Sequence, residues 1–254
     1  MAGLIATRLR EEESPEMDIR VFPSEAELAI QSAAFFKEKV KQAIDERGRF
    51  SVLLSGGHSP IAFFRRLPEI SLPWDKMDLF WGDERMVPAD SPESNFLNFK
   101  KNCLDQVQVP EKNIHRVKTE LGDPKRVAAD YEQEMKKLFP EMKWPRFDFA
   151  LQGLGPDGHT ASLFPGSQTE HDSTDWVIAP YVEKLGAFRI SVSLGVLNSA
   201  RTVLFLVTGS EKAEMTRQVL REPRDHRGLL PSQRVHPTDG QLLWFLDSQA
   251  ASRL

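Results

Sequence analysis

The sequence predicts an α/β domain built on a parallel β-sheet that helices cover on both faces. Short apolar runs such as Phe50-Ser51-Val52-Leu53-Leu54 alternate along the chain with longer segments of helical periodicity. These runs end in glycine or polar residues, and continuous rather than alternating apolar strands are typical of sheets buried on both sides. The length of 254 residues is sufficient for one large core of this kind.

The first predicted elements are a long helix, a strand and a short helix. Ser24 and Glu27 form a capping box, and the apolar residues behind it keep helical spacing to about Arg47. A strand is predicted at residues 50–54. Pro60 can open the following helix, because its missing N–H group needs no partner at that position.

The rest of the chain continues the alternation of strands and helices. Residues 77–81 are predicted as a strand that ends in the polar segment 82–85. Asp123 followed by Pro124 is typical of a helix start, because aspartate caps and proline fits the first turn. The buried stripe of that helix is predicted at Val127, Tyr131, Met135 and Leu138. Further strands are predicted at residues 147–151, 176–179, 188–193, 203–208 and 242–246.

The domain organisation is predicted to be simple. No internal repeat and no long Gly/Ser/Pro-rich linker divides the chain, so we expect residues 20–254 to form a single α/β domain. Residues 1–19 are expected to form a flexible N-terminal tail. Their acidic run at 11–13 and the lack of an apolar segment argue against a signal or transit peptide.

Composition and charge exclude several classes of partner. The 33 Lys and Arg residues against 37 Asp and Glu give a net charge of −4, which argues against nucleic acid, since its binders carry a basic face. No apolar run reaches the roughly 18 residues of a membrane span, so we expect no membrane partner. The single cysteine, Cys103, cannot form an internal disulfide, and we expect it to lie packed in the core of a cytoplasmic protein.

Four predicted strands end in polar or glycine-rich segments, which a parallel sheet brings to one edge. The first, Ser55-Gly56-Gly57, lets the backbone approach a ligand and precedes a helix whose first N–H groups attract anions. A simple tight turn is the alternative. The second, Gly82-Asp83-Glu84-Arg85, offers acids to sugar hydroxyls and an arginine to a phosphate. A surface cluster of ion pairs is the alternative there.

The third segment, residues 153–166, is the richest in candidate chemistry. It contains His159, and a histidine has an ordinary pKa of about 6.5, which suits proton transfer near neutral pH. Asp157, two residues earlier, can orient the imidazole and stabilise its charged form. Four glycines within these fourteen residues free the backbone to form a pocket wall. These features favour a functional histidine over a structural one.

The fourth segment, Gly209-Ser210-Glu211-Lys212, follows the strand predicted at 203–208. Ser210 is predicted to cap a helix that runs to Leu220, and Lys212 then opposes the helix dipole unless an anion is bound. A solvated lysine is the alternative. The six histidines have no metal-binding spacing, and no GxSxG elbow is present. The residues therefore predict proton-transfer or hydrolytic chemistry on a phosphorylated small molecule, without metal or cofactor.

These segments, together with three others, resemble a known family. The resemblance rests on Ser55-Gly56-Gly57 with Pro60, Trp81–Arg85 with Ser94-Asn95, Arg189-Ile190-Ser191, Asn198-Ser199-Ala200, and Val207-Thr208-Gly209 with Lys212-Ala213. The most specific piece is Gly-Pro-Asp-Gly-His-Thr-Ala-Ser-Leu-Phe-Pro-Gly at residues 155–166. Over about residues 20–247 the sequence is thus similar to the 6-phosphogluconolactonase family.

The resemblance implies both a fold and an activity. The fold would be a Rossmann-like, three-layer parallel-sheet domain of the NagB/RpiA type, shared with glucosamine-6-phosphate deaminase and ribose-5-phosphate isomerase. The activity would be hydrolysis of 6-phospho-D-glucono-1,5-lactone to 6-phospho-D-gluconate, the second step of the oxidative pentose phosphate pathway. The expected partner is this phosphosugar lactone alone, bound by a monomer or a weak homo-oligomer that needs no cofactor.

Two alternatives stay open at this point. The glucosamine-6-phosphate deaminase/isomerase pattern shares the Gly-His core, but it has an aromatic residue in place of Arg85 and Asn-Glu-Pro in place of Ser162-Leu163-Phe164-Pro165. Both differences favour the lactonase. A non-catalytic sugar-phosphate sensor normally carries a DNA-binding module, and the residues before the first predicted helix are too few to form one.

The resemblance also suggests a role for each candidate residue. His159 would take a proton from the water that attacks C1, and Asp157 would orient its ring. The candidate oxyanion donors are the backbone N–H groups of either the Gly56-Gly57 turn or the turn from Gly155 to Gly158, and the sequence does not choose between them. The expected phosphate-binding cations are Arg85 and Lys212, with Arg189 as a third candidate. We assign no role to His58, and leave open whether Asp83 or Glu84 contacts the sugar.

Overall fold

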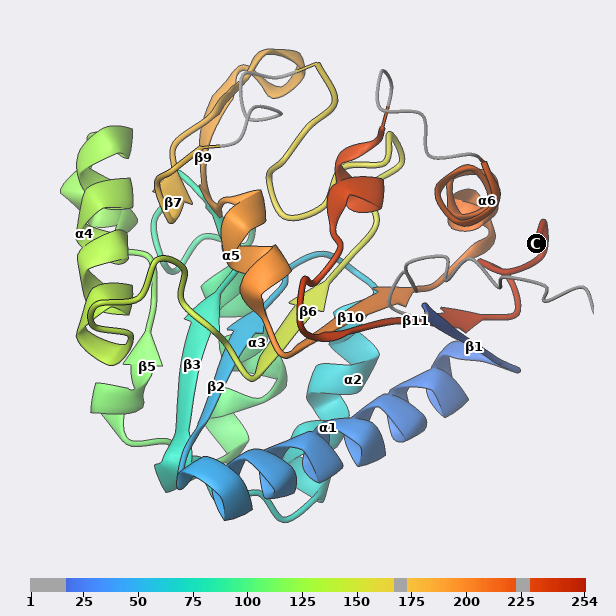
Figure 1. Cartoon of the computed structure of the whole chain (residues 1–254), viewed down its shortest axis with the longest axis horizontal. Helices are drawn as coiled ribbons and strands as arrows, with labels where there is room; N and C mark the ends of the chain where they lie inside the picture. Colours follow the sequence, from blue (N-terminus) through green and yellow to red (C-terminus); the bar gives the residue numbers. More distant parts are fainter. Residues whose placement is uncertain (1–16, 167–172, 223–228) are drawn as a thin grey trace, which may run out of the picture.

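A central parallel sheet organises the molecule (Figure 1). The structure is a computed structural model that describes residues 17–166, 173–222 and 229–254. The seven strands of the central sheet all pair in parallel. In spatial order they are β1 (Asp18–Phe22), β11 (Gln241–Asp247), β10 (Thr202–Val207), β6 (Phe149–Gln152), β2 (Phe50–Leu54), β3 (Met77–Trp81) and β5 (Ile114–His115). The sheet thus brings both ends of the described chain together at β1 and β11.

Helices cover both faces of this sheet and complete a three-layer α/β fold. They are α1 (Glu25–Arg47), α2 (Pro60–Arg66), α3 (Asn95–Asn102), α4 (Pro124–Leu138), α5 (Leu194–Ser199) and α6 (Ala213–Arg221). Buried residues of α1, α2 and α3 belong to one hydrophobic core, and those of α4, α5 and α6 belong to a second core. Figure 1 shows α1 and α2 on one side of the sheet and α5 and α6 on the other.

Strand β2 shows why its residues form a fully buried central strand. Val52 and Leu54 pack into the core beside α1, while Leu53 between them packs into the core beside α4. Successive side chains of a strand point to opposite faces, so a strand covered on both sides has no polar face. The predicted α/β class and parallel sheet are therefore confirmed.

A second, smaller sheet lies beside the end of β3. It is antiparallel and contains β4 (Asp83–Arg85), β9 (Ala187–Val192) and β7 (Val177–Ile178), and β8 (Tyr181–Val182) also pairs with β9. The segment 82–85 was predicted only as the polar end of the strand at 77–81, and the short strand within it was not predicted. The chain turns at Gly82, whose N–H donates to Leu54 O, and then continues as β4 along β9.

Most other predicted elements are confirmed with small shifts at their ends. The capping hydroxyl of Ser24 accepts from Glu27 N at 3.2 Å, and α1 ends at Arg47 as expected. The strand predicted at 147–151 is found at 149–152. Ser210 does not cap a helix: it begins a short 3-10 helix at 210–212, and α6 follows from Ala213 without a side-chain cap.

The expected N-terminal tail is two residues too long. Asp18 and Ile19 pair with β11 as the start of β1, an edge strand that apolar patterning did not reveal. Met17 packs against the core, and residues 1–16 of that expected tail lie outside the described residues. In the described part of the chain no helix is long and apolar enough to cross a membrane. Cys103 is fully buried, as expected of a packing cysteine, and burial raises the pKa of its thiol to about 12.

Candidate active site

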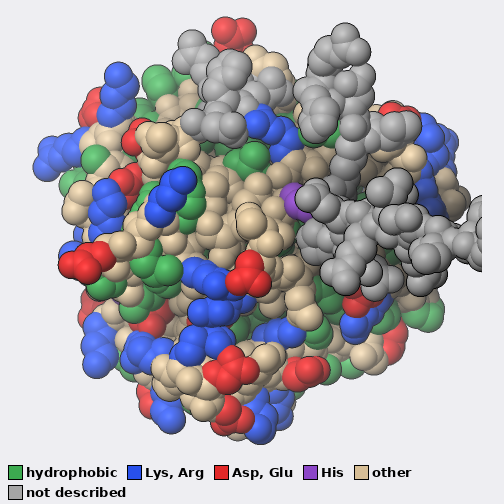
Figure 2. Space-filling model, viewed as in Figure 1, with side chains coloured by type: hydrophobic (Ala, Val, Ile, Leu, Met, Phe, Trp, Pro, Cys, Tyr) green, Lys and Arg blue, Asp and Glu red, His purple; other side chains and the backbone are tan. Residues whose placement is uncertain are grey.

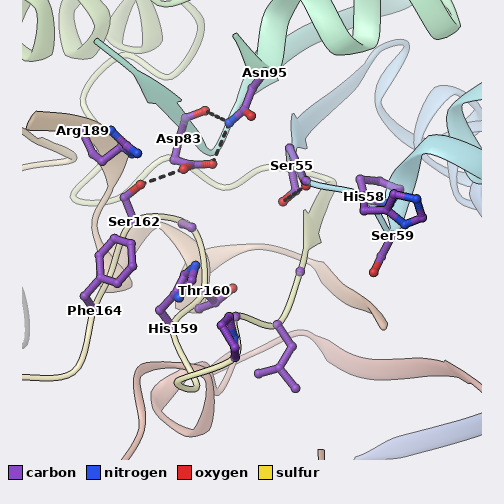
Figure 3. A pocket seen from close by; sticks show the side chains of 18 of the residues that line it. Ser55, His58, Ser59, Asp83, Asn95, His159, Thr160, Ser162, Phe164 and Arg189 are labelled. Atoms are coloured by element: carbon purple, nitrogen blue, oxygen red, sulfur yellow. Dashed lines mark hydrogen bonds between the residues drawn. The ribbon is translucent and has the colours of Figure 1, made fainter. Parts of the chain in front are cut away.

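The four strand-end segments meet at one pocket, as the topology predicted. The pocket has a volume of about 560 Å³ and opens at the carboxyl ends of β2, β3, β6 and β10. Each segment contributes to its lining, through Gly56, Asp83, His159 and Lys212 among others. Figure 3 shows His159 facing the same space as Asp83, with the Ser55 turn across from them.

His159 is held by its neighbour in sequence, Asp157. The ring Nδ1 lies 2.5 Å from Asp157 Oδ1, and the same oxygen accepts from the His159 backbone N–H at 3.3 Å. Among the described residues, Nε2 of His159 has no hydrogen-bond partner, and the residue lines the pocket while Asp157 does not. A carboxylate on Nδ1 favours the tautomer with a proton there, which leaves the Nε2 lone pair free toward the pocket.

Close packing fixes the plane of the His159 ring. A Cβ atom at Gly155 would lie 2.0 Å from Nδ1, so only glycine permits the ring to rest on this stretch of backbone. On its other side the ring contacts Phe164, with centroids 4.3 Å apart. Ala161, between them in sequence, has a φ of +48°, a left-handed conformation that is uncommon for a residue with a side chain. The turn is thus shaped to hold the imidazole in place.

The electrostatics of the pocket favour a neutral imidazole. Burial lowers the pKa of His159 from 6.5 to about 4, and the charges of Lys212, Arg189 and Arg85 act in the same direction while Asp83 opposes it. The carboxylate of Asp157 also opposes it, because it stabilises the imidazolium. His159 is therefore unprotonated and able to accept a proton at neutral pH.

Lys184 is a pocket residue that the sequence did not reveal. It belongs to a short 3-10 helix at 183–185 between β8 and β9, and its ammonium forms an ion pair with Asp157 Oδ2. The ammonium also lies 4.5 Å from the ring centroid of Phe164. Because Phe164 and Asp157 both contact His159, Lys184 supports the histidine from two sides. No local motif signals this contact, which spans 27 residues.

Asp83 lies inside the pocket, and two neutral donors hold it there (Figure 3). Its Oδ1 accepts from Asn95 Nδ2 at 3.1 Å, and its Oδ2 accepts from Ser162 Oγ at 2.7 Å. A Cβ atom on Gly56 would clash with the Asn95 side chain at 1.8 Å, so glycine is required there. This network joins the turns after β2, β3 and β6 into one rigid wall.

Glu84, next to Asp83, has a structural role. It is buried and outside the pocket lining, and its carboxylate accepts from Ser94 Oγ and from the backbone N–H groups of Asn95 and Phe96. These groups lie at the start of α3, where unpaired N–H groups favour an anion. Burial raises the pKa of Glu84, whereas the backbone N–H donors lower it. Of the two acids left open by the sequence, only Asp83 faces the ligand space.

Arg85 and Arg189 line the pocket as a pair of like charges. They are direct partners across the antiparallel ladder of β4 and β9. Arg85 donates to the carbonyl of Glu93 at 2.5 Å, and Arg189 donates to the carbonyl of Phe188 at 3.3 Å. Burial lowers the pKa of Arg189, and the charge of Arg85 lowers it further. Like charges directly opposite each other destabilise a sheet, so this pair is typical of an anion site.

Lys212 enters the pocket from the segment after β10. Burial lowers the pKa of its ammonium, and the neighbouring Glu211 partly restores it. The start of this segment contacts the glycine turn after β2, since Thr208 N and Oγ1 lie 3.3 and 3.1 Å from Ser59 Oγ. Lys212 is thus a third half-buried cation, from a segment separate from the strands that supply Arg85 and Arg189.

The backbone donors expected from the sequence differ in availability. The Gly155 N–H donates to His159 O at 2.8 Å, and the Gly158 N–H donates to Gly155 O at 3.1 Å. Gly158 is also absent from the pocket lining. By contrast, within the described part of the chain the N–H groups of Gly56 and Gly57 donate to no protein group, and both residues line the pocket. The turn after β2 therefore supplies the available amides.

The remaining polar side chains offer no metal-binding cluster in the described residues. Within residues 17–166, 173–222 and 229–254, no three His, Cys, Asp or Glu side chains are grouped so that they could hold a metal ion. His58 lies at the rim of the pocket beside Ser59, with no contact to His159 (Figure 3). The polar groups that line the ligand space therefore include the His159 imidazole, the Asp83 carboxylate, several cations and the Gly56 and Gly57 amides, and His58 and Glu211 also belong to the lining.

Comparison with known proteins places the chain in a family. A family model described as glucosamine-6-phosphate isomerases/6-phosphogluconolactonase matches residues 23–244. The 6-phosphogluconolactonase of Nostoc sp. is 37% identical over 238 residues, which cover 93% of this chain and 98% of that protein. The 6-phosphogluconolactonase of Synechocystis sp. is 38% identical over 218 residues, or 85% of this chain and 89% of that protein.

A solved structure agrees with these sequence matches. The 6-phosphogluconolactonase from Trypanosoma brucei superimposes with a TM-score of 0.84 and 28% identity, covering 95% of this chain and all (100%) of that one. The relatives and the structural neighbour are thus lactonases that this chain matches over nearly its whole length. The chain belongs to the family of glucosamine-6-phosphate isomerases and 6-phosphogluconolactonases.

Proposed function

We propose that this protein hydrolyses 6-phospho-D-glucono-1,5-lactone to 6-phospho-D-gluconate, within the oxidative pentose phosphate pathway. The observation that carries the proposal is the orientation of His159. Its Nδ1 is fixed by Asp157 at 2.5 Å, and its free Nε2 belongs to a pocket that is also lined by four cations, Arg85, Lys184, Arg189 and Lys212. A general base beside a cationic pocket suits an ester with a phosphate at its far end.

In the proposed reaction His159 moves one proton in each half of the cycle. Nε2 accepts a proton from the water whose oxygen attacks C1, and Asp157 stabilises the imidazolium that forms. The tetrahedral intermediate then collapses, the bond between C1 and the ring oxygen breaks, and Nε2 returns the proton to that oxygen. The product is the open-chain acid, and the imidazole is neutral again. None of these steps is routed through a metal ion.

Two sets of groups would bind the anionic parts of the substrate. Arg85 and Arg189 face each other with no salt bridge to a carboxylate among the described residues, and Lys212 is a third, half-buried cation, so a phosphate would supply the charge that they lack. The N–H groups of Gly56 and Gly57 are free to donate to a second anionic oxygen, such as the oxyanion at C1. The phosphate is remote from C1, and its binding energy serves to orient the lactone.

Lys184 acts in this proposal as a positioning residue. Its ion pair with Asp157 keeps that carboxylate against Nδ1, and its contact with Phe164 keeps the phenyl ring against the imidazole. It therefore acts through His159 and not on the substrate. Its effect should appear in kcat and in the pH profile rather than in KM.

The decisive experiment follows the loss of freshly prepared lactone against its spontaneous hydrolysis. We expect the wild-type protein to accelerate the loss, His159→Ala not to, and EDTA to leave the rate unchanged. In parallel the protein is offered glucosamine 6-phosphate and tested for ammonia. Ammonia release without lactone loss would identify a deaminase, and lactone binding without turnover would identify a sensor. A loss of activity with EDTA would overturn the metal-free reaction.

A further inference from the structure

A second polar cavity lies at the opposite edge of the central sheet. It has a volume of about 190 Å³ and opens where β10 and β11 begin, beside the end of α1. Its lining residues are Lys39, Gln42, Glu46, Arg47, Arg146, Asp148, Arg201, Thr202 and Gln241, and none of them lines the active-site pocket. In Figure 2, Lys and Arg side chains gather just below the centre of the view, over the region where β6 and β10 start in Figure 1.

The lining of this cavity carries more positive than negative charge. Four cations face two carboxylates, in a chain whose overall charge is −4. One of those carboxylates, Asp148, is already occupied. Its Oδ2 accepts from Ser51 N at 2.8 Å and from Ser51 Oγ at 2.9 Å, and its Oδ1 accepts from Arg47 Nε at 3.1 Å. The cavity therefore has a surplus of donors.

Arg201 is the cation whose hydrogen-bonding capacity is least used. Its Nε is buried and donates no hydrogen bond, and the nearest carboxylate oxygen, Asp148 Oδ1, is 3.5 Å away. Burial lowers the pKa of Arg201, and the charges of Arg47 and Arg146 lower it further. A guanidinium has five donors in a rigid fork, and that of Arg201 is 36% exposed with only its Nε buried, so an anion that enters the cavity can accept from the unused donors.

Lys39 is the second cation of this cavity whose hydrogen-bonding capacity is little used. In the described part of the chain its ammonium donates to the neutral side-chain oxygen of Gln241, at 2.8 Å, and has no salt bridge. Lys39 belongs to α1 and lines the cavity, and its ammonium lies 5.2 Å from the ring centroid of Phe35. Lys39 has no salt bridge among the described residues and Arg201 has only the 3.5 Å contact with Asp148, so both leave donors available to the same cavity.

We propose that this cavity binds a phosphate group, either the free ion or a small monoester, through Arg201 and Lys39. Phosphate oxygens match the fork of a guanidinium, and an ammonium adds a second, less directional contact. The space is several times the roughly 30 Å³ that one water molecule occupies in the liquid, so a phosphate with a short substituent can enter. The site is distinct from the active site and does not depend on the proposed reaction.

The test measures phosphate binding in a background that lacks the phosphate-binding cations proposed for the active site. The background is the Arg85→Gln/Arg189→Gln/Lys212→Gln triple variant, titrated by calorimetry with inorganic phosphate and, separately, with glycerol 3-phosphate. Adding Arg201→Gln or Lys39→Gln is expected to weaken binding by about tenfold or more, the usual value of a charged hydrogen bond. The matched control is Arg116→Gln, an arginine paired with Glu120 outside both cavities, which should leave binding unchanged.

Each outcome decides the proposal. Tighter binding of inorganic phosphate identifies the free ion as the ligand, and tighter binding of glycerol 3-phosphate identifies a monoester. The proposal is overturned if the background protein binds neither compound, or if Arg201→Gln and Arg116→Gln bind them equally. Should Arg201→Gln fail to fold, Lys39→Gln decides alone, since Lys39 lies on the surface of α1.

Discussion

The two edges of the central sheet both carry arginines, but these arginines are paired with a carboxylate at one edge and with each other at the other edge. At the amino edge, Arg49 donates to both oxygens of Asp78, at 2.8 and 2.9 Å. At the carboxyl edge, Arg85 and Arg189 face each other and donate only to main-chain carbonyl groups. The difference therefore lies in pairing and not in composition.

This difference shows how a binding site can be recognised before its ligand is known. A fold gains stability when its buried charges are paired, and it loses stability when like charges are left together. A pocket that keeps cations, free amides and an imidazole nitrogen unpaired bears that cost in the absence of ligand. The ligand supplies the missing partners, so unpaired groups mark the binding surface. The exception at the amino edge, Arg201, is the basis of the proposed phosphate site.

The largest effect is expected from His159→Ala. Removing the general base should lower kcat by about 10²–10⁴-fold, while the affinity for 6-phosphogluconate is largely retained because the cations remain. Steady-state kinetics with fresh lactone and a product-binding titration measure the two quantities. The matched control is His58→Ala, a histidine at the rim of the same pocket, which should keep its kcat. Near-wild-type turnover in His159→Ala would remove this residue as the base.

The next effect tests the unpaired arginines. Arg85→Gln or Arg189→Gln should raise KM by about 10–100-fold, since each removes a charged hydrogen bond to phosphate. The free energy of unfolding should stay the same or rise, because the repulsion between the two charges is removed. Arg49→Gln is the control from the other edge, with KM unchanged and stability lowered. If KM is unaffected in both pocket variants, the phosphate lies elsewhere.

The pH dependence of kcat tests the state of His159. Burial and the charges of the pocket cations lower its pKa from 6.5 to about 4, so the apparent pKa of kcat should lie well below 6.5. The base works above this pKa, and activity should fall about tenfold per pH unit below it. In Asp157→Asn the profile should move to lower pH, because the anion that stabilises the imidazolium is gone. An apparent pKa above 6.5 would contradict the neutral, buried imidazole.

A smaller change is expected from Lys184→Met. The ion pair with Asp157 is half exposed, and such pairs contribute about 0.2–1 kcal/mol, which corresponds to a fall in kcat of only a few fold. Loss of the cation should also raise the apparent pKa of kcat, while KM stays constant. Lys184→Arg should restore both values. A change in KM alone would place Lys184 on the substrate instead of behind the histidine.

The sequence predicted best what depends on neighbouring residues. The strand at 50–54 was predicted within a residue because both of its faces are buried, and Asp157 with His159 was predicted because they lie two residues apart. Strand β1 was missed, since an edge strand with an exposed face lacks a continuous apolar run. The three-residue strand β4 was missed because its identity depends on β9, more than a hundred residues away.

The same distinction holds within the candidate site. Lys184 and Ser162 hold Asp157 and Asp83 across 27 and 79 residues, and no spacing rule connects such positions. The sequence also could not separate two sets of glycine amides, because their difference is one of hydrogen bonding. The N–H groups of Gly155 and Gly158 donate to carbonyl groups within their own turn, whereas the N–H group of Gly56 donates to no group of the described chain. Contacts between distant segments therefore decided what the motifs had left open.

The smallest effect on catalysis is expected at the amino edge, from Asp148→Asn. Its carboxylate accepts from Ser51 and Arg47, so the substitution should lower the free energy of unfolding by about 1–3 kcal/mol. Activity should stay unchanged, because the residue lies away from the pocket, and the affinity of the second cavity for phosphate should rise. Asp157→Asn should do the reverse, with kcat lowered and stability little changed. Equal losses of kcat in Asp148→Asn and Asp157→Asn would contradict this comparison. They would mean that the carboxylate at the amino edge matters for catalysis as much as the one beside His159.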